Sequence, residues 1–427
     1  MSQQPKVDGL RLGIIRPDFG GRGGFERHLE SVTGELVERG WDVESIVLDG
    51  CQARTRLFGF DIKPVQHEFH DDYFKYLSLV AQVAELELSR FDVVLTTQPP
   101  TYLARHPRKV ALFYHQARQF YDLAEPYLTS GFAAAEVHHQ AIESVHRIDR
   151  AGIADVQHWL AGSATTADRL EYFWSIPRER ISHYQAPPEC TIPPEPTPHS
   201  PAGPILHVGR FEWPKRAELL VEALHRIPAG PHANSEACFV GSGSRMEFVR
   251  SLDARLGAEA EQRRAGLDLT DPSPAEQIWM NRGIFTAGWE PDTRDPSGRL
   301  RFLGTVDDDK RDALYRDASM VVAPALNEDY GLTAVEAMAF ARPVIVCSDG
   351  GGLTELVEHE VTGLVVPPDA DELAKAIDRL LGDPAFAASL GLAGYRRVAG
   401  MSRASATSQI ENALLAALAD RGQLQLL

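Results

Sequence analysis

Short apolar runs alternate with helical stretches along the whole chain. The strand-like runs span 10–17, 92–96, 110–114, 159–163, 205–209, 318–323 and 343–347. The helical stretches between or after them include 25–39, 133–150, 217–226 and 401–418. Runs as short and apolar as these are typical of parallel strands that helices cover on both faces. The pattern predicts an α/β fold with two doubly wound halves.

A proline-rich segment separates the two halves. Prolines recur throughout 185–204, and each removes a backbone N–H that a helix or sheet would need. At 427 residues, the chain also exceeds the size at which one hydrophobic core usually stops growing. We therefore predict an N-terminal Rossmann-like domain over 1–187, a linker over 188–204, a second Rossmann-like domain over 205–400 and a helical segment over 401–427.

Charge and cysteine content narrow the functional classes. The formal net charge of −17 argues against binding to nucleic acid or anionic lipid, because basic surface is what binds phosphate backbones. The N-terminus is polar and no run of 18 apolar residues occurs, so we expect a cytoplasmic protein without an integral membrane segment. The four cysteines lie far apart, which favours neither a disulfide framework nor a zinc site. Cys238 and Cys347 lie in apolar runs and are predicted to be buried thiols.

Two glutamates eight residues apart, Glu328 and Glu336, follow the run 318–323. Because that run ends at Pro324, the loop leaves the carboxyl end of a buried strand. Gly331 then opens a helix, whose first backbone N–H groups form a ready anion site. Carboxylates beside such a site can accept hydrogen bonds from sugar hydroxyls. The segment predicts a site for a phosphorylated sugar.

Two further loops carry candidate chemistry in the same half. The run 205–209 ends at Gly209 and is followed by Arg210 and, five residues later, Lys215, a pair suited to a diphosphate. Glycines at 350–352 follow the run 343–347 and permit either a tight turn or close approach to a ligand. Asp307 to Asp309 precede a helical stretch, so helix capping explains these acids better than a metal site does.

The first half begins with a strand, a glycine loop and a helix. The loop 20–24 contains Gly23 and Gly24 but lacks a clear G-x-G-x-x-G followed by an acid at the next strand end. His115 lies at the end of the run 110–114, the position where active groups of such sheets are usually found. These residues are the candidates of the N-terminal half.

Together these segments resemble one known family. Glu328-x7-Glu336 with Gly331, the Gly-Arg…Lys element at 209–215, the turn at 350–352 and the Gly-Gly-Phe-Glu-Arg loop at 23–27 are similar to the retaining, glycogen-synthase-like glycosyltransferases (glycosyl transferases group 1). The resemblance is strong over 204–383 and weaker over 10–183. It implies the GT-B fold, with two Rossmann-like domains facing a cleft and a C-terminal helix that crosses back to the N-terminal domain.

The resemblance also implies roles for individual residues. Arg210 and Lys215 would neutralise the leaving diphosphate of a nucleotide diphosphate sugar, with GDP or UDP as the expected nucleotide. Glu328 would hold the donor sugar and Glu336 the ribose. The remaining donor-site residues implied are Gly209, Thr333, the backbone amides of Tyr330, Gly331 and Leu332, the glycines Gly23 and Gly24 facing the diphosphate and acceptor, and His115 lining the sugar site. No metal and no further cofactor is expected.

Several alternatives stay open. A GT-B phosphorylase or sugar-nucleotide epimerase would share the fold and the phosphate grip, and a non-catalytic nucleotide-sugar-binding subunit would need no turnover. The aromatic and polar segment 113–122 suits a small polar acceptor. An added segment, 266–299, could be an acceptor-side flap, a dimer contact or a surface excursion, and a homodimer is therefore left open.

Overall fold

The computed structural model describes residues 7, 9–21, 23–63, 70–129, 134–264 and 299–419, with the backbone alone at 259–264. The added segment expected at 266–299 therefore lies outside the described residues except for its last residue. The described chain forms two compact units. One contains the residues up to Ala186 together with those from Ser402 on, and the other contains those from Pro187 to Met401.

The N-terminal unit is built on a six-stranded parallel sheet with the order β2-β1-β5-β6-β7-β8. Its elements are β1 (Arg11–Asp18), α1 (Gly24–Glu38), β2 (Asp42–Asp49), β3 (Arg56–Leu57), β4 (Phe60–Asp61), α3 (Asp71–Ala84), β5 (Val93–Thr96), β6 (Lys109–Phe113), α4 (Ala124–Thr129), α5 (Ala135–Gly152), β7 (His158–Ala161), α6 (Ala164–Trp174), β8 (Ile181–His183) and α15 (Arg403–Ala419). Strands β3 and β4 form a separate antiparallel hairpin.

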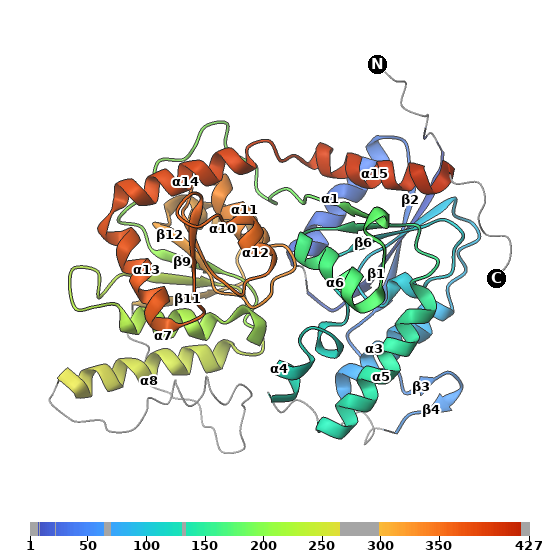
Figure 1. The fold of residues 1–427 in the computed structure, drawn as a ribbon, viewed down its shortest axis with the longest axis horizontal. Helices are drawn as coiled ribbons and strands as arrows, with labels where there is room; N and C mark the ends of the chain where they lie inside the picture. Colours follow the sequence, from blue (N-terminus) through green and yellow to red (C-terminus); the bar gives the residue numbers. More distant parts are fainter. Residues whose placement is uncertain are drawn as a thin grey trace. The chain divides into compact units, whose positions relative to one another are not determined.

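The last helix of the chain is part of this N-terminal unit. Helix α15 lies against α1 and against β5 and β6 (Figure 1). Glu411 of α15 accepts hydrogen bonds from Arg39 at 2.8 Å and from the Trp41 indole at 3.0 Å. A nearly buried carboxylate that is bonded to a guanidinium and an indole has its charge compensated, so these contacts anchor the C-terminal helix.

The second unit also has a six-stranded parallel sheet, with the order β11-β10-β9-β12-β13-β14. Its elements are β9 (Ile205–Val208), a 3₁₀ turn η4 (Trp213–Lys215), α7 (Ala217–Arg226), β10 (Ala237–Val240), α8 (Met246–Arg264), β11 (Leu300–Gly304), α10 (Asp308–Asp317), β12 (Met320–Ala323), α11 (Leu332–Ala339), β13 (Val344–Cys347), α12 (Gly352–Leu356), β14 (Gly363–Val366), α13 (Ala370–Gly382) and α14 (Pro384–Val398).

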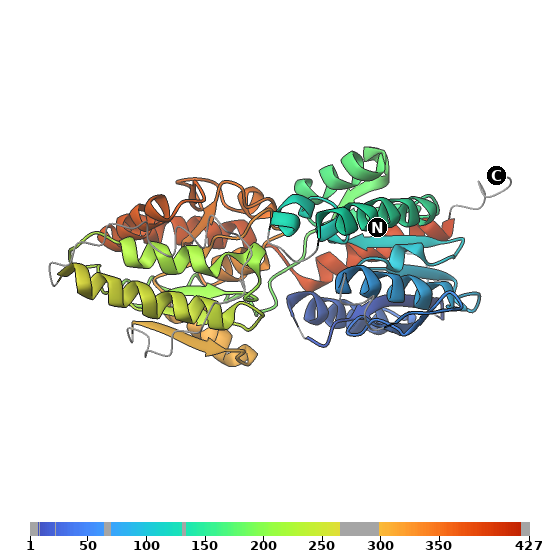
Figure 2. The same ribbon diagram turned by 90° about the horizontal axis from the view of Figure 1, so that it is seen from below.

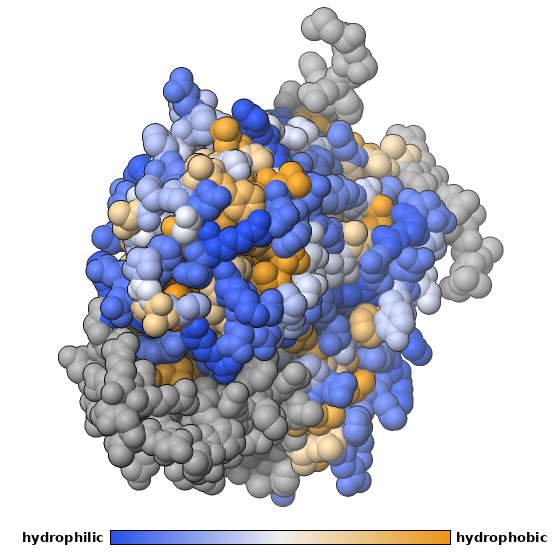
Figure 3. All heavy atoms as spheres, turned by 60° about the vertical axis from the view of Figure 1, so that its left-hand side comes forward, coloured by the Kyte–Doolittle hydropathy of each residue, from blue (hydrophilic) through white to orange (hydrophobic). Residues whose placement is uncertain are grey.

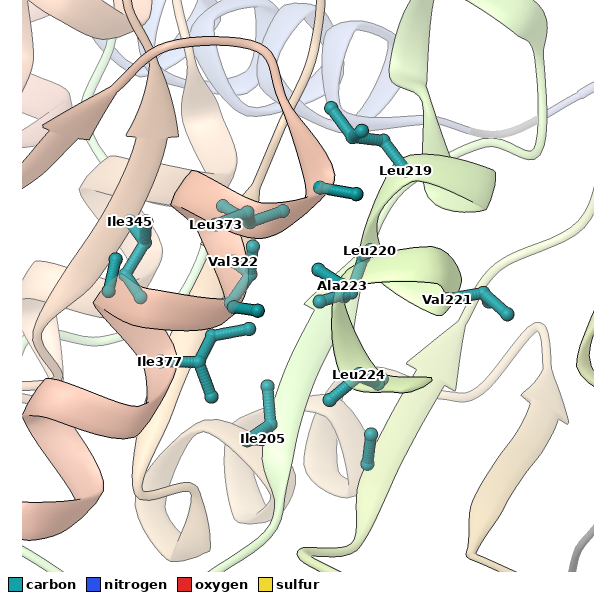
Figure 4. Close-up of a cluster of buried hydrophobic side chains, with 14 of the residues drawn as sticks. Ile205, Leu219, Leu220, Val221, Ala223, Leu224, Val322, Ile345, Leu373 and Ile377 are labelled. Carbon is teal, nitrogen blue, oxygen red and sulfur yellow. The ribbon is translucent and has the colours of Figure 1, made fainter. Parts of the chain in front are cut away.

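Helices cover both faces of each sheet (Figures 1 and 2), which explains why the strands are apolar on both sides. In the second unit, apolar residues of all six strands contribute to one large core cluster. Figure 4 shows Ile205, Val322 and Ile345 of this cluster beside side chains of α7 and α13. The surface is different: the described part that Figure 3 shows is mainly hydrophilic, with apolar residues in small groups.

The main predictions about the elements are confirmed. Each of the seven strand-like runs corresponds to a strand whose ends lie within two residues of those predicted. Cys238 and Cys347 are buried thiols. The Asp307 side chain caps α10 by accepting from the Lys310 backbone N–H at 2.8 Å. Within the described ranges, no helix has the length and apolar character needed to cross a membrane.

Candidate functional site

The strand order of the second unit marks one place for a ligand. From β9 the chain moves outward to β10 and β11, whereas β12, β13 and β14 lie on the other side of β9. The winding direction therefore changes between β9 and β12. In open α/β sheets, ligands bind beyond the carboxyl ends of the strands at such a switch point. The loops that begin there are 209–216 after β9 and 324–331 after β12, and they contain six of the nine residues predicted in this unit.

Backbone hydrogen bonds tie these loops together. The Leu326 N–H donates to the carbonyl of Pro214 at 2.7 Å, which joins the loop after β12 to the loop after β9. The Glu328 N–H donates to Gly350 at 2.9 Å, and the Glu328 carbonyl accepts from Gly352 at 2.7 Å. Glu328 is thus held on both sides of its peptide unit by the turn after β13. The three loops form one connected surface.

The glycines of this region serve close packing. Gly331 has φ 112°, and a β-carbon there would lie 2.7 Å from the Leu353 side chain. Gly351 has φ 60°, and a β-carbon there would meet the carbonyl oxygen of Glu328 at 2.6 Å. Packing between the loops therefore accounts for Gly351 without a ligand. Gly331 precedes α11, whose first N–H groups have no partner within the helix.

Lys215 and Glu328 are brought together across 113 positions of sequence. The Lys215 ammonium donates a hydrogen bond to the Glu328 carboxylate, and the two form an ion pair. Their side chains are 26% and 19% exposed. The pair therefore lies at the surface of the site, where both charges can still be reached by a ligand.

A second ion pair, which the sequence analysis missed, involves Arg216, the residue after Lys215. Arg216 is bonded through both terminal nitrogens to the Asp349 carboxylate, at 2.8 and 2.7 Å. Asp349 belongs to the turn after β13, which was singled out for its glycines alone. An acidic residue within a predicted ligand-side turn is the signal that could have identified it.

The other predicted residues of this unit differ in exposure. Arg210 is exposed and is the second residue of the loop after β9. Tyr330 is buried, and burial raises the pKa of its hydroxyl. The Thr333 hydroxyl donates to the carbonyl of Val208 at 3.2 Å, which joins the start of α11 to the end of β9. Gly209 follows that same strand end.

Glu336 points into the protein rather than into the loop cluster. It is 4% exposed, accepts a hydrogen bond from the Tyr315 hydroxyl at 2.8 Å and lies 3.9 Å from the Arg311 guanidinium. Both partners belong to α10. Its expected contact with a ribose stays a prediction.

His207 is a buried polar residue of β9 to which the sequence assigned no role. Its Nδ1 donates to the carbonyl of Val322 at 3.0 Å. Burial, with a smaller contribution from the charge of Lys215, lowers the pKa of His207 to about 4. The imidazole is therefore neutral, with its proton on Nδ1. A histidine within an apolar run is the signal that could have marked it.

The N-terminal unit has its own switch point, between β1 and β5. Gly23 and Gly24 lie at the start of α1, where the Gly23 N–H donates to the Glu26 carboxylate at 2.8 Å. The rings of Phe25 and Tyr114 meet edge to face at 4.8 Å, so the glycine loop neighbours the loop after β6. His115 follows in that loop, and its Nδ1 lies 2.5 Å from the carbonyl oxygen of Gln116.

The predicted residues thus form two groups, one in each unit. Gly23, Gly24 and His115 belong to the N-terminal unit, and the remaining candidates belong to the second. Among the described side chains, no group of three or more His, Cys, Asp or Glu residues could hold a metal ion. At the switch point of the second unit, the predicted residues supply two cations, a carboxylate and a helix start.

Comparison with known proteins gives a consistent result. Residues 292–397 match the family Glycosyl transferases group 1. An uncharacterized glycosyltransferase of Methanocaldococcus jannaschii is 31% identical over 43% of this chain and 36% of its own length. A D-inositol 3-phosphate glycosyltransferase of Nocardia farcinica is 26% identical over 95% of this chain and 87% of its own. Several curated relatives are matched over only about a third to a half of their length.

Solved structures share the fold. The sucrose-phosphate synthase of Thermosynechococcus elongatus superimposes with a TM-score of 0.61 at 20% identity, over 96% of this chain and all of that one. HepE of Anabaena in complex with UDP and glucose gives 0.60 at 16% identity, over 95% and 100% of the two chains. These likenesses extend over both units of the chain.

Proposed function

We propose that this chain, a member of the glycosyl transferases group 1 family with the GT-B fold, transfers a sugar from a nucleotide diphosphate sugar to an acceptor with retention of anomeric configuration. The observation that carries the proposal is the meeting of Lys215 and Glu328 at the switch point beside the start of α11. A cation for phosphate, a carboxylate for sugar hydroxyls and a helix start for anions then lie within one loop cluster.

The diphosphate is assigned to Arg210, Lys215 and the first turn of α11. Arg210 is exposed and Lys215 is partly exposed, so both can reach an incoming ligand. Negative charge grows on the diphosphate as the bond to the anomeric carbon breaks. Positive groups held in place before the reaction stabilise that charge most in the transition state.

Glu328 is assigned to the donor sugar. Its backbone is fixed on both sides by the turn after β13, and its carboxylate is held by Lys215. We assign it hydrogen bonds from sugar hydroxyls near the reacting carbon. In the same proposal the acceptor attacks the anomeric carbon on the face that the diphosphate leaves. The new glycosidic bond forms as the bond to phosphate oxygen breaks, and the acceptor proton passes to that oxygen.

The relatives and the residues of this chain indicate which nucleotides and acceptors to test first. HepE of Anabaena was solved with UDP and glucose, which makes UDP the first nucleotide to test and GDP the second. Relatives from Corynebacterium aurimucosum and Nocardia farcinica bear the name D-inositol 3-phosphate glycosyltransferase. Together with the polar and aromatic segment 113–122, this supports a small polar acceptor.

The test is a panel of UDP and GDP sugars, each offered with small polyol acceptors. Release of the nucleotide diphosphate should require one donor, and NMR of the product should show the anomeric configuration of the donor. Sugar release that depends on inorganic phosphate would identify a phosphorylase instead. An epimerised nucleotide sugar would identify an epimerase. Tight nucleotide binding without turnover of any donor would favour a non-catalytic subunit.

A further inference from the structure

Arg216 has a rare backbone conformation directly after the proposed phosphate-binding lysine. Its φ and ψ are 51° and 40°, in the left-handed region that residues other than glycine seldom adopt. The residue is only 6% exposed, although it carries a full charge. Such a conformation persists only where the surrounding structure holds it, and it is concentrated at functional sites.

Arg216 is connected to Glu328 through Asp349 and the turn after β13. Its guanidinium forms a bidentate pair with the carboxylate of Asp349, at 2.8 and 2.7 Å. The backbone carbonyl of Asp349 accepts from Asn327 at 2.7 Å, and the next carbonyl, of Gly350, accepts from Glu328 at 2.9 Å. A bidentate pair fixes both distance and orientation. The loop that carries Lys215 is thereby fastened to the turn that holds Glu328.

We propose that Arg216 is a positioning residue, which acts through Asp349 to hold Lys215 and Glu328 in register. This inference rests on the proposed function of that pair. The bond to Asp349 prevents the two loops from moving apart when a ligand binds to Lys215 or Glu328.

A purely structural role would give a different result, and two substitutions separate the alternatives. Both Arg216→Gly and Arg216→Ala remove the guanidinium. Glycine tolerates the left-handed conformation and alanine does not, so the glycine variant should have the higher melting temperature. If Arg216 serves positioning, both variants should lose kcat to the same extent, about 100-fold for a displacement on the order of 1 Å.

The partner gives a second measurement. Asp349→Asn keeps the shape of the side chain but removes its charge, and it should lower kcat to a similar degree. Combining it with Arg216→Gly should cause little further loss, because residues that act as one unit are not additive. Free guanidinium ion at millimolar concentration should restore part of the activity of Arg216→Gly, and none in the double variant.

The chain contains a matched control at Glu360. This residue also has a left-handed backbone, with φ 60°, and pairs with Arg379 at 2.5 Å. It lies before β14, in a loop at the opposite end of the strands from the candidate site. Glu360→Gly and Glu360→Ala should differ in melting temperature in the same direction as the Arg216 variants, with wild-type turnover in both.

The outcomes are separable from a failure of the proposed function. The wild-type protein is assayed in parallel, and absence of turnover there would refute the proposed function itself. With an active wild type, loss of activity that follows melting temperature, with Arg216→Ala far below Arg216→Gly, would overturn the positioning role. Wild-type turnover of Arg216→Gly, or guanidinium rescue that persists without Asp349, would overturn it as well.

Discussion

Replacement of Glu328 by glutamine should have opposite effects on nucleotide binding and on turnover. In the structure, the Glu328 carboxylate is bonded to the Lys215 ammonium. A diphosphate must compete with that carboxylate for the lysine. Glutamine keeps the shape of the side chain but removes the charge, so Lys215 becomes more available to phosphate. The same change removes the acceptor that we assign to the donor sugar.

The magnitudes follow from the exposure of the pair. A partly exposed pair contributes at most about 1 kcal/mol, so Glu328→Gln should tighten bare nucleotide diphosphate by up to about fivefold. A charge-assisted contact to phosphate is worth about 1.5–3 kcal/mol. Lys215→Ala loses that contact, but the pair no longer has to be broken, which leaves a net loss of about 0.5–2 kcal/mol, or about two- to thirtyfold in Kd. For Glu328→Gln, kcat should fall about 100-fold.

Calorimetry with the bare nucleotide diphosphate, set beside steady-state turnover with the full donor, measures both effects. The Lys215→Ala variant is the control with the opposite sign in binding. A double variant should bind no better than Lys215→Ala, because the benefit of removing the carboxylate requires the lysine. Equal weakening of nucleotide binding by Glu328→Gln and Lys215→Ala would refute this reasoning. The segment 328–336 would then serve only to begin α11.

Three further predictions concern the same unit. Burial holds the pKa of His207 at about 4, below the usual value of about 6.5. The unfolded chain therefore gains a proton first as pH falls from about 6.5 to 4, which should cost about 3 kcal/mol of stability; denaturant titrations against pH should show a smaller loss in His207→Gln. Glu336→Gln should weaken nucleotide diphosphate and nucleotide sugar alike, by about 1–2 kcal/mol in calorimetry, if the ribose contact is correct; unchanged affinity with a lower melting temperature would assign Glu336 to Tyr315 and Arg311 alone. A chelator should leave turnover nearly unchanged, because cationic side chains and a helix start are proposed to neutralise the diphosphate, and rescue by magnesium or manganese would contradict this.

Much of the fold could be predicted because its signals are local. A run such as 343–347 is apolar whatever lies around it, and its length and the glycines after it indicate a buried strand. The acid at Asp307 caps a helix only three residues away. The short hairpin of β3 and β4 was not predicted, since two-residue strands leave no periodic pattern.

The site was predictable in part for the same reason. Gly331 and the start of α11 are local features, and the structure has them where the sequence predicted. Which charges would meet was not visible. The sequence predicts that Lys215 binds the diphosphate and Glu328 the sugar, but only the structure shows that the two side chains pair with each other. The polar partners of Glu336 lie on α10, a helix given no part in the site.

The amino-acid sequence alone determined the alternation of apolar strands and helices, the two-unit organisation expected of a chain of this length, and the residue types available to bind a phosphorylated sugar. Tertiary structure alone decided how those residues pair. Arg216 and Asp349 are 133 positions apart, and only the adjacency of strands in the sheet brings their loops together. Hydrophobic periodicity is a pattern among residues close together in the sequence. The partner of a charged side chain depends instead on which strands are neighbours in the sheet.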